Sequence, residues 1–290
     1  MPASPAFTTL VSATELAAHR DDLRWVILDC RHDLLDPGAG RAAFTEGHIP
    51  GARFAAIDTA LSDKSPAPDG RFRGRHPLPP RAAFIETLRD WGIDDRTQVV
   101  AYDAHGGMFA ARLWWMLRWV GHLSVAVLDG GLPAWRASGL PLTTGAEAPP
   151  VRGTIEDRPT LTITVQAQDI VAGFGLGKRT VIDARAPDRF RGENETMDPV
   201  GGHIPGAKNR FFKDNLQADG RFRPAVELHA AFAALVDEPA AAIMQCGSGV
   251  TACHNLLAME VAGLPGAALY PGSWSEWCAD EARPMATGPA

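Results

Sequence analysis

The sequence predicts an α/β protein of two similar domains, each a parallel sheet flanked by helices on both faces. Three observations support this class. Short apolar, β-branched runs alternate with helical patterns, 46% of the 290 residues are hydrophobic, and two motifs recur at a domain-sized spacing. Strands that are buried on both faces lack strict alternation of polar residues, so such runs between helices indicate parallel sheets.

The repeats define the domain organisation. The motif GHIPGA occurs at 47–52 and 202–207, and DGRFR occurs at 69–73 and 219–223. The two offsets, 155 (202 − 47) and 150 (219 − 69), match the length of an ordinary domain. A Pro- and Gly-rich stretch without periodicity separates the halves. We therefore expect an N-terminal domain over 1–145, a linker over 146–160 and a C-terminal domain over 161–290.

Each half contains the same alternation of elements. In the first half we expect strands at 25–29, 98–102 and 124–128, with helices at 80–92 and 109–121. In the second half we expect strands at 180–183, 241–245 and 267–270, with helices at 225–236 and 250–263. Ligands of such sheets bind beyond the carboxyl ends of the strands. Loops that follow strands are therefore the places to look for a site.

Charge and composition exclude several classes of function. The formal net charge is −6 and the pI is about 5.8, which argues against a nucleic-acid or membrane-surface protein. The N-terminal residues lack the basic and apolar regions of a secretory signal, and the longest apolar stretch, 113–128, is too short to span a bilayer. We expect a soluble, cytoplasmic protein whose four cysteines are free thiols, because they lack the spacing of a zinc site.

The segment CGSGVT, from Cys246 to Thr251, is the strongest candidate site. It follows a predicted strand and precedes a helix that begins around Val250. Gly247 and Gly249 allow backbone angles that turn successive N–H groups toward one point above the sulfur. The helix N-terminus adds further donors and a positive dipole, which favour a thiolate or a bound oxyanion. Cys246 is therefore a candidate nucleophile.

Alternative interpretations of this segment are weaker. Most free cysteines are small buried hydrophobes, an interpretation that suits Cys253, inside the helix, and Cys30, which lacks a glycine-rich loop. A cysteine phosphatase needs arginine where Ala252 stands. A serine hydrolase elbow centred on Ser248 needs glycine at 246, and the glycine-rich stretch 173–180 precedes a strand, unlike a nucleotide-binding loop.

The doubled GHIPGA, the DAR-x-x-x-RF pattern at 183–190 and CGSGVTA at 246–252 resemble the tandem rhodanese family of sulfurtransferases. The resemblance extends from about residue 8 to 287. The uncharged residues after the cysteine are more similar to members that use 3-mercaptopyruvate than to those that use thiosulfate. The resemblance implies that Cys246 takes a sulfane sulfur from the donor as a persulfide and passes it to an acceptor.

The resemblance also implies the partners. The donor is a small molecule, and the acceptor is cyanide or a thiol such as thioredoxin or glutathione. Neither a metal nor an organic cofactor is required, and we expect no nucleic-acid or membrane partner. The position equivalent to Cys246 in the first half is Asp103, which cannot carry a sulfane sulfur, so the N-terminal domain should be catalytically inactive.

Four further side chains take roles from the resemblance. Arg189 matches the arginine that holds the donor's carboxylate or sulfonate, and Ser248 matches the serine that relays a proton to the leaving group. His76 matches a substrate contact, and Asp63 matches the partner of that serine. Simpler interpretations stay open for the last two, because His76 could be a solvated loop residue and Asp63 a turn residue.

One departure from the family pattern concerns a second arginine, which mercaptopyruvate enzymes bear shortly before the second GHIPG motif. No arginine occurs here between Arg191 and His203. Either Arg191 substitutes from another angle, or carboxylate binding is weaker. A thiosulfate sulfurtransferase and a non-catalytic persulfide carrier for a protein partner therefore remain as alternatives.

Overall fold

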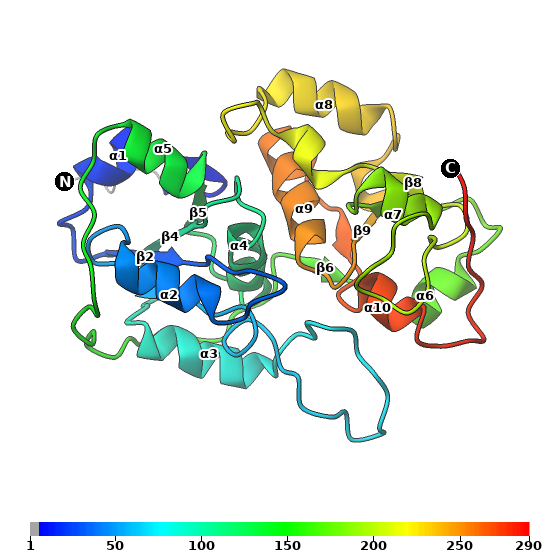
Figure 1. The fold of residues 1–290 in the computed structure, drawn as a ribbon, viewed down its shortest axis with the longest axis horizontal. Coiled ribbons are helices and arrows are strands. Elements are labelled where there is room, and N and C mark those ends of the chain that lie inside the picture. The colour runs from blue at the N-terminus through cyan, green and yellow to red at the C-terminus, as the bar shows by residue number, and fades with distance from the viewer. Residues whose placement is uncertain (1–5, 290) are drawn as a thin grey trace. The chain divides into compact units, whose positions relative to one another are not determined.

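The computed structural model describes residues 6–289, which form two compact units with one five-stranded parallel sheet each (Figure 1). Unit 1 comprises the chain up to Ser62, together with Pro79–Leu161 and Gln217–Phe222. Unit 2 comprises Asp63–Leu78, Thr162–Leu216 and the chain from Arg223 onward. Residues 1–5 and 290, at the outer ends of the two expected domains, lie outside the described residues. The predicted α/β class is confirmed.

The sheet of unit 1 has the strand order β1-β5-β4-β2-β3, and all of its pairings are parallel. Its strands are β1 (Leu10–Val11), β2 (Trp25–Asp29), β3 (Arg53–Phe54), β4 (Gln98–Tyr102) and β5 (Val125–Leu128). Its helices are α1 (Ala13–Ala18), α2 (Ala39–Glu46), α3 (Arg81–Asp90), α4 (Ala110–Trp119) and α5 (Gly131–Ala137).

Helices cover both faces of this sheet. Leu16 of α1, Phe44 of α2 and Trp135 of α5 pack with Val100 and Tyr102 of β4 in one apolar cluster. The intervening residues of β4 are also fully buried, and α4 packs against β4 and β5. Burial on both faces explains why β4 is an uninterrupted apolar run in the sequence.

The sheet of unit 2 repeats this architecture with the order β6-β10-β9-β7-β8, again all parallel. Its strands are β6 (Ile163–Thr164), β7 (Thr180–Asp183), β8 (Lys208–Asn209), β9 (Ala242–Gln245) and β10 (Ala268–Leu269). Its α-helices are α6 (Ala167–Ala172), α7 (Pro187–Arg191), α8 (Ala225–Ala233), α9 (Thr251–Val261) and α10 (Ser273–Trp277), with 3-10 turns η1 (Phe212–Asn215) and η2 (Pro239–Ala241).

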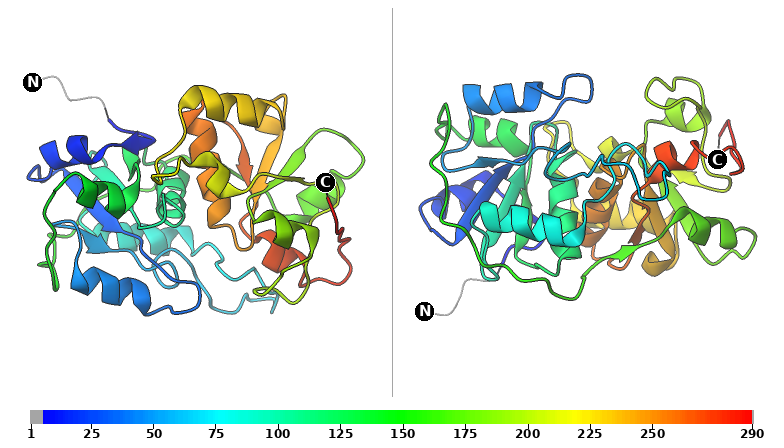
Figure 2. Two further views of the ribbon diagram at one scale, coloured as in Figure 1. Left: turned by 45° about the horizontal axis from the view of Figure 1, so that its top comes forward. Right: turned by 90° about the horizontal axis from the view of Figure 1, so that it is seen from below.

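The faces of this second sheet are also both covered. Ile170 of α6, Phe190 of α7 and Trp274 and Trp277 of α10 pack with Ile243 of β9. On the other face α9 packs against β9 and α8 packs against α9. The left view of Figure 2 shows α8, in yellow, beside α9, in orange. In the described part of the chain, no helix is long and apolar enough to cross a membrane.

The predicted strands and helices are present within one or two residues at most ends, although α8 ends three residues earlier than expected. The two-residue strands β1, β3, β6 and β8 and several short helices were not predicted from the sequence. A strand of two residues offers no periodicity, and these four pair along one side only at the edges of the sheets. Their positions follow from tertiary contacts instead.

Each unit contains a segment from the other half of the sequence. The segment Asp63–Leu78, which contains the first DGRFR motif, belongs to unit 2. The segment Gln217–Phe222, which overlaps the second DGRFR motif, belongs to unit 1. There the Phe222 N–H donates to the Asp129 carboxylate at 2.8 Å. The stretch 146–160, expected as a linker, packs in unit 1, where the Gly153 N–H donates to the Arg89 carbonyl at 2.8 Å.

The strand order of unit 2 determines where a site can form. The chain runs from β7 outward to β8 at one edge and then returns to β9 on the other side of β7. Connections therefore diverge between β7 and β9, and parallel sheets bind ligands beyond the carboxyl ends at such a switch point. Asp183 ends β7 and Gln245 ends β9, so Arg185 and Cys246 follow the two central strands at this point.

Candidate active site

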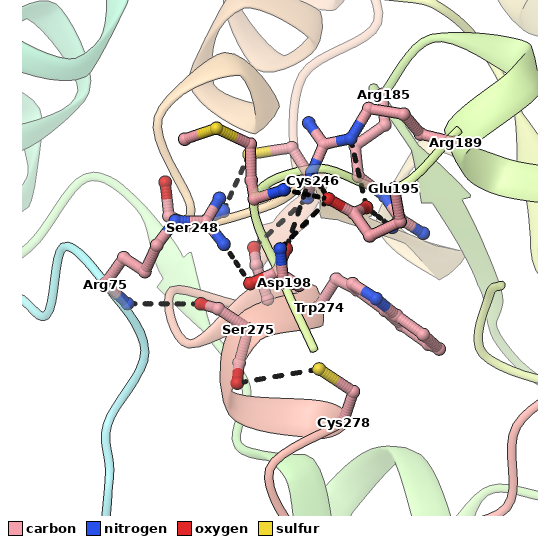
Figure 3. A network of polar contacts seen from close by, with 12 residues as sticks. Arg75, Arg185, Arg189, Glu195, Asp198, Cys246, Ser248, Trp274, Ser275 and Cys278 are labelled. Atoms are coloured by element: carbon pink, nitrogen blue, oxygen red, sulfur yellow. Dashed lines mark hydrogen bonds and ion pairs between the residues drawn. The ribbon is translucent and has the colours of Figure 1, made fainter. Parts of the chain in front are cut away.

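Cys246 is the first residue after β9, five residues before α9 begins. Its side chain is buried, with 2% of its surface exposed. The Ser248 N–H donates to the Cys246 sulfur at 3.5 Å, so the loop turns an amide toward this atom (Figure 3). Val250 is the N-cap of α9 and Thr251 its first residue, which puts the sulfur near the positive end of an eleven-residue helix. This local geometry directs hydrogen-bond donors at the sulfur.

The segment from Pro271 to Ser275, which includes the start of α10, supports the cysteine loop. The Ser273 hydroxyl accepts the Cys246 N–H at 3.1 Å. The Trp274 and Ser275 N–H groups donate at 2.9 Å to the carbonyls of Cys246 and Gly247. Ser273 has a φ of 55°, and no other non-glycine residue of 6–289 has a positive φ. Such strain persists where surrounding contacts fix the backbone, so the segment around Ser273 holds Cys246 rigidly.

The two glycines of the cysteine loop are required for different reasons. Gly249 has a φ of +75°, and a Cβ there would lie 2.3 Å from the Pro271 carbonyl oxygen. A Cβ on Gly247 would lie 2.7 Å from the Arg75 Nη2 atom and 3.6 Å from Arg189 Nη2. Gly249 therefore permits close backbone packing, whereas Gly247 leaves room for two guanidinium groups over the loop.

Arg189 lies at this loop, where the sequence predicted a donor-binding residue. Its guanidinium makes a bidentate pair with Glu195, at 3.0 and 2.8 Å, and Nη2 lies 3.4 Å from Asp198. Both carboxylates are almost fully buried, and Arg189 is about one-fifth exposed. Arg191 instead pairs with the exposed Glu193 at 2.7 Å. Its described contacts therefore do not support a role for Arg191 at the cysteine loop.

Arg75 is a second arginine at this loop, and the sequence did not predict it. Its guanidinium pairs with Asp198, and its main-chain N–H donates to the Ser275 hydroxyl at 3.1 Å (Figure 3). Asp198 thus contacts Arg75 and Arg189 at once. Only its position next to His76, itself a predicted contact, could have drawn attention to Arg75 in the sequence.

Arg185 places a third cation near the cysteine. It pairs with Asp183 at 2.7 Å, donates to the Gly202 carbonyl at 2.6 Å and stacks over the Trp274 ring. Burial opposes its charge, but the negative charges of Asp183, Glu195 and Cys246 raise the pKa of Arg185 above its ordinary value. Arg185 is therefore a fixed positive charge in the surroundings of Cys246.

The Ser248 hydroxyl, expected to pair with Asp63, lies 2.8 Å from His76 Nδ1. The Asp63 carboxylate accepts the Ser65 N–H at 2.9 Å and lies 3.6 Å from Arg73. These contacts of Asp63 are those of a turn residue, and its pairing with Ser248 stays a prediction. His76 is buried and contacts the serine directly.

The comparisons with known proteins agree with this geometry. The family model for the rhodanese-like domain matches residues 12–138 and 166–280. The chain belongs to the rhodanese-like domain family. A Pseudomonas aeruginosa protein assigned as a 3-mercaptopyruvate sulfurtransferase is 48% identical over 285 residues, which cover 96% of this chain and 98% of that protein.

Two further members of the rhodanese-like family illustrate its range. A Mycobacterium tuberculosis protein assigned as a thiosulfate sulfurtransferase is 40% identical, with 91% of each chain covered. The solved structure of 3-mercaptopyruvate sulfurtransferase from Leishmania major matches with a TM-score of 0.83 and 30% identity, covering 96% of this chain and 76% of that one. The predicted tandem rhodanese organisation is confirmed.

The other cysteines of this rhodanese-like chain lie in less favourable surroundings. Cys253 is fully buried in α9, and its S–H donates to the Gly249 carbonyl at 3.3 Å. Burial, with the charges of Asp29 and Asp103, raises the pKa of Cys30 well above its ordinary value. Burial and nearby Asp198 raise the pKa of Cys278. Cys30 and Cys278 are therefore held as thiols, and all four cysteines are free.

The first rhodanese-like half has an aspartate where the second has Cys246. Asp103 directly follows β4, as Cys246 follows β9. Four main-chain N–H groups donate to its carboxylate at 2.7–3.0 Å, from the residues His105, Gly107, Phe109 and Ala110. The loop after β4 therefore directs its main-chain N–H groups at one carboxylate, which is the side chain of Asp103 itself.

Proposed function

We propose that the protein is a sulfurtransferase that moves a sulfane sulfur from 3-mercaptopyruvate to a thiol or cyanide acceptor through a persulfide on Cys246. The reaction consists of two nucleophilic displacements at sulfur, each of which returns a closed-shell product. Neither step requires a metal or an organic cofactor. The observation that carries the proposal is the cysteine loop itself, with an amide directed at the sulfur and a Ser248–His76 pair next to it.

In the first displacement the Cys246 thiolate attacks the sulfur of 3-mercaptopyruvate. A sulfur–sulfur bond forms, the carbon–sulfur bond breaks, and its electron pair leaves with carbon as the enolate of pyruvate. The N–H of Ser248, the N-terminus of α9 and the charge of Arg185 support the thiolate beforehand. The same amides are suited to hold the persulfide afterwards.

The choice of donor rests on the leaving group. An enolate must gain a proton at carbon to become pyruvate, so this donor benefits from a proton relay. Thiosulfate releases sulfite, which leaves as a stable anion and needs no proton. The Ser248 hydroxyl and His76 Nδ1, 2.8 Å apart, form a pair that can deliver a proton, so their presence favours 3-mercaptopyruvate.

Arg189 is suited to bind the carboxylate of this donor. A planar guanidinium matches a carboxylate with two parallel hydrogen bonds, and Gly247 lets it approach the loop. Glu195 orients the group through its own bidentate pair. The N–H groups of Gly247, Gly249, Val250 and Thr251 complete the proposed donor site.

In the second displacement an acceptor attacks the outer sulfur of the persulfide and restores the Cys246 thiolate. Cyanide, glutathione or a protein thiol such as that of thioredoxin can serve, because each provides a nucleophile at neutral pH. We propose that the first half, residues 1–145, carries out no transfer. Its equivalent position holds Asp103, which four amides already satisfy.

Thiosulfate sulfurtransfer is the second candidate. It is favoured by the name of the Mycobacterium tuberculosis relative and by the absence of arginine between Arg191 and His203. A comparison of steady-state kinetics with both donors, with cyanide as acceptor, separates the two. We expect the higher kcat/KM with 3-mercaptopyruvate. A kcat/KM at least ten times higher with thiosulfate would reverse the choice of donor.

Mass spectrometry of the protein after brief incubation with each donor tests the intermediate. The enzyme should gain one sulfur on Cys246 and lose it on addition of cyanide. Loading only from a partner protein, with no gain from either small donor, would instead identify a persulfide carrier.

A further inference from the structure

The two guanidinium groups over Gly247 belong to segments far apart in the sequence. Arg189 lies in α7, and Arg75 lies in the segment Asp63–Leu78, yet both belong to unit 2. Their Nη2 atoms approach the Cβ position of Gly247 to 3.6 and 2.7 Å. Figure 3 shows both side chains near the cysteine loop. Gly247, next to Cys246, thus has no side chain at the place where Arg75 and Arg189 converge.

We infer that Arg75 is a donor-binding residue, which with Arg189 forms a paired-guanidinium seat for the donor's carboxylate beside Cys246. The inference rests on the proposed function and extends it to a residue of the first half of the sequence. It also accounts for the missing arginine before the second GHIPGA motif, because the second cation comes from another segment.

The contacts of Arg75 leave it able to bind a ligand. Its guanidinium is held by one carboxylate, Asp198, whereas Arg185 is held by both oxygens of Asp183 and by the Gly202 carbonyl. Arg75 Nε is buried and makes no hydrogen bond within residues 6–289. The Arg75 side chain is 24% exposed, so an incoming anion can accept hydrogen bonds from the accessible part of its guanidinium.

Asp198 is the counter-ion that Arg75 and Arg189 share. It contacts both Arg75 and Arg189, and its side chain is 2% exposed. Two arginines in proximity repel each other unless an anion lies between them. Asp198 therefore keeps the pair assembled, and the main-chain bond from Arg75 to Ser275 ties the same segment to the loop that supports Cys246.

The charges at the site set the kind of donor. Three arginines, Arg75, Arg185 and Arg189, are matched by three carboxylates, Asp183, Glu195 and Asp198. Before the thiolate is counted, this set is neutral. A neutral site next to a thiolate repels a dianion more than a monoanion, so it suits a donor with one carboxylate better than thiosulfate.

Equilibrium binding of 3-mercaptopyruvate tests the inference without depending on turnover. Isothermal titration calorimetry is performed on the Cys246→Ser protein, which cannot accept sulfur. We expect addition of Arg75→Gln to weaken binding at least tenfold, because a neutral amide replaces the cation. The matched change Arg191→Gln, at the exposed pair with Glu193, should alter binding less than twofold. Equal affinity with and without Arg75→Gln would overturn the inference, as would no measurable binding to the Cys246→Ser protein.

Kinetics of the otherwise native enzyme provide the second measurement. Arg75→Gln should raise the KM for 3-mercaptopyruvate at least tenfold and leave the KM for cyanide within twofold. Arg75→Lys retains a charge and should raise the donor KM by less than Arg75→Gln does. A purely structural role would change both KM values and the thermal unfolding midpoint together, which would count against donor binding.

The two proposals can fail separately. Absence of turnover by the native enzyme with either donor would contradict the proposed function, whatever the calorimetry shows. Turnover by the native enzyme with an unchanged affinity in the Arg75→Gln protein would contradict only the role of Arg75. If Arg75→Gln does not fold, Arg75→Lys decides, and a donor affinity and KM equal to those of the native residue would then overturn the inference.

Discussion

The loops after β4 and β9 occupy equivalent places in two sheets of the same strand order, yet they treat negative charge differently. After β4, the Asp103 carboxylate accepts four main-chain N–H groups. After β9, one N–H points at the Cys246 sulfur, and the remaining donors are suited to a sulfur that arrives and leaves. One fold thus places a carboxylate held by four amides in one half and the proposed nucleophile in the other.

The surroundings of the two loops sharpen this contrast. Phe44 stacks on His48 in unit 1 as Phe190 stacks on His203 in unit 2, with ring centroids 3.8 Å apart in both. This match makes Ala43 the counterpart of Arg189. The scaffold is therefore shared by the two halves, whereas this position holds alanine in unit 1 and arginine in unit 2.

Removal of the Cys246 thiol should have the largest effect. We expect Cys246→Ser to lower sulfur transfer by roughly a thousandfold or more, because the covalent intermediate cannot form. Cys253→Ser, one of the buried cysteines, should retain most of the activity. Steady-state transfer to cyanide measures both, and substantial activity in the Cys246→Ser protein would refute the assignment.

Removal of the Asp103 carboxylate should affect stability instead. Asp103→Ala orphans four N–H groups, and we expect it to lower the free energy of unfolding by about 3 to 5 kcal/mol, less if water enters. Asp103→Asn keeps one acceptor oxygen and should cost roughly half as much. Denaturation by urea, followed by tryptophan fluorescence, measures these changes. The control Asp21→Ala, at an exposed pair, should change stability by less than about 0.5 kcal/mol. Equal stability of Asp103→Ala and this control would show that the four N–H groups do not need the carboxylate.

Arg189, whose counterpart in unit 1 is Ala43, should control the affinity for the donor. We expect Arg189→Ala to raise the KM for 3-mercaptopyruvate by roughly 10- to 100-fold with a smaller change in kcat, since a carboxylate clamp acts in the ground and transition states alike. The KM of Arg189→Lys should lie between those of the native enzyme and Arg189→Ala, because lysine keeps the charge but loses the bidentate geometry. An unchanged KM would remove this role.

The counter-ion of the arginine pair should have the smallest effect. Asp198→Asn makes the site more positive, and we expect the ratio of kcat/KM for thiosulfate to that for 3-mercaptopyruvate to rise roughly fivefold. Glu193→Gln, at the exposed partner of Arg191, is the matched control and should leave the ratio unchanged. If both variants behave alike, local charge does not select the donor.

The sequence predicted the parts of the molecule whose signals are local. The strands β2, β4, β7 and β9 are buried on both faces and therefore form continuous apolar runs. The site around Cys246 was predicted because a strand end, two glycines and a helix start lie within ten residues. The structure explains both glycines, because a side chain at Gly247 would meet Arg75 and one at Gly249 would meet the Pro271 carbonyl.

The residues that the sequence missed depend on contacts over long distances along the chain. Arg75 bonds to Ser275, two hundred positions away, and the contact between Ser248 and His76 joins residues 172 positions apart. Their segment, Asp63–Leu78, has no helix or strand, so no periodicity could indicate where it packs. The strain at Ser273 likewise arises from tertiary contacts.

The exchange of segments between the units bears on how the protein could be divided. A gene fragment that encodes residues 161–290 would contain Cys246 but neither His76 nor Arg75, because both lie in Asp63–Leu78. The complementary fragment would lack Gln217–Phe222, which belongs to unit 1. Although the sequence looks like two modules joined in tandem, each unit takes a segment from the other half, so a cut between the halves would part Cys246 from two of its neighbours.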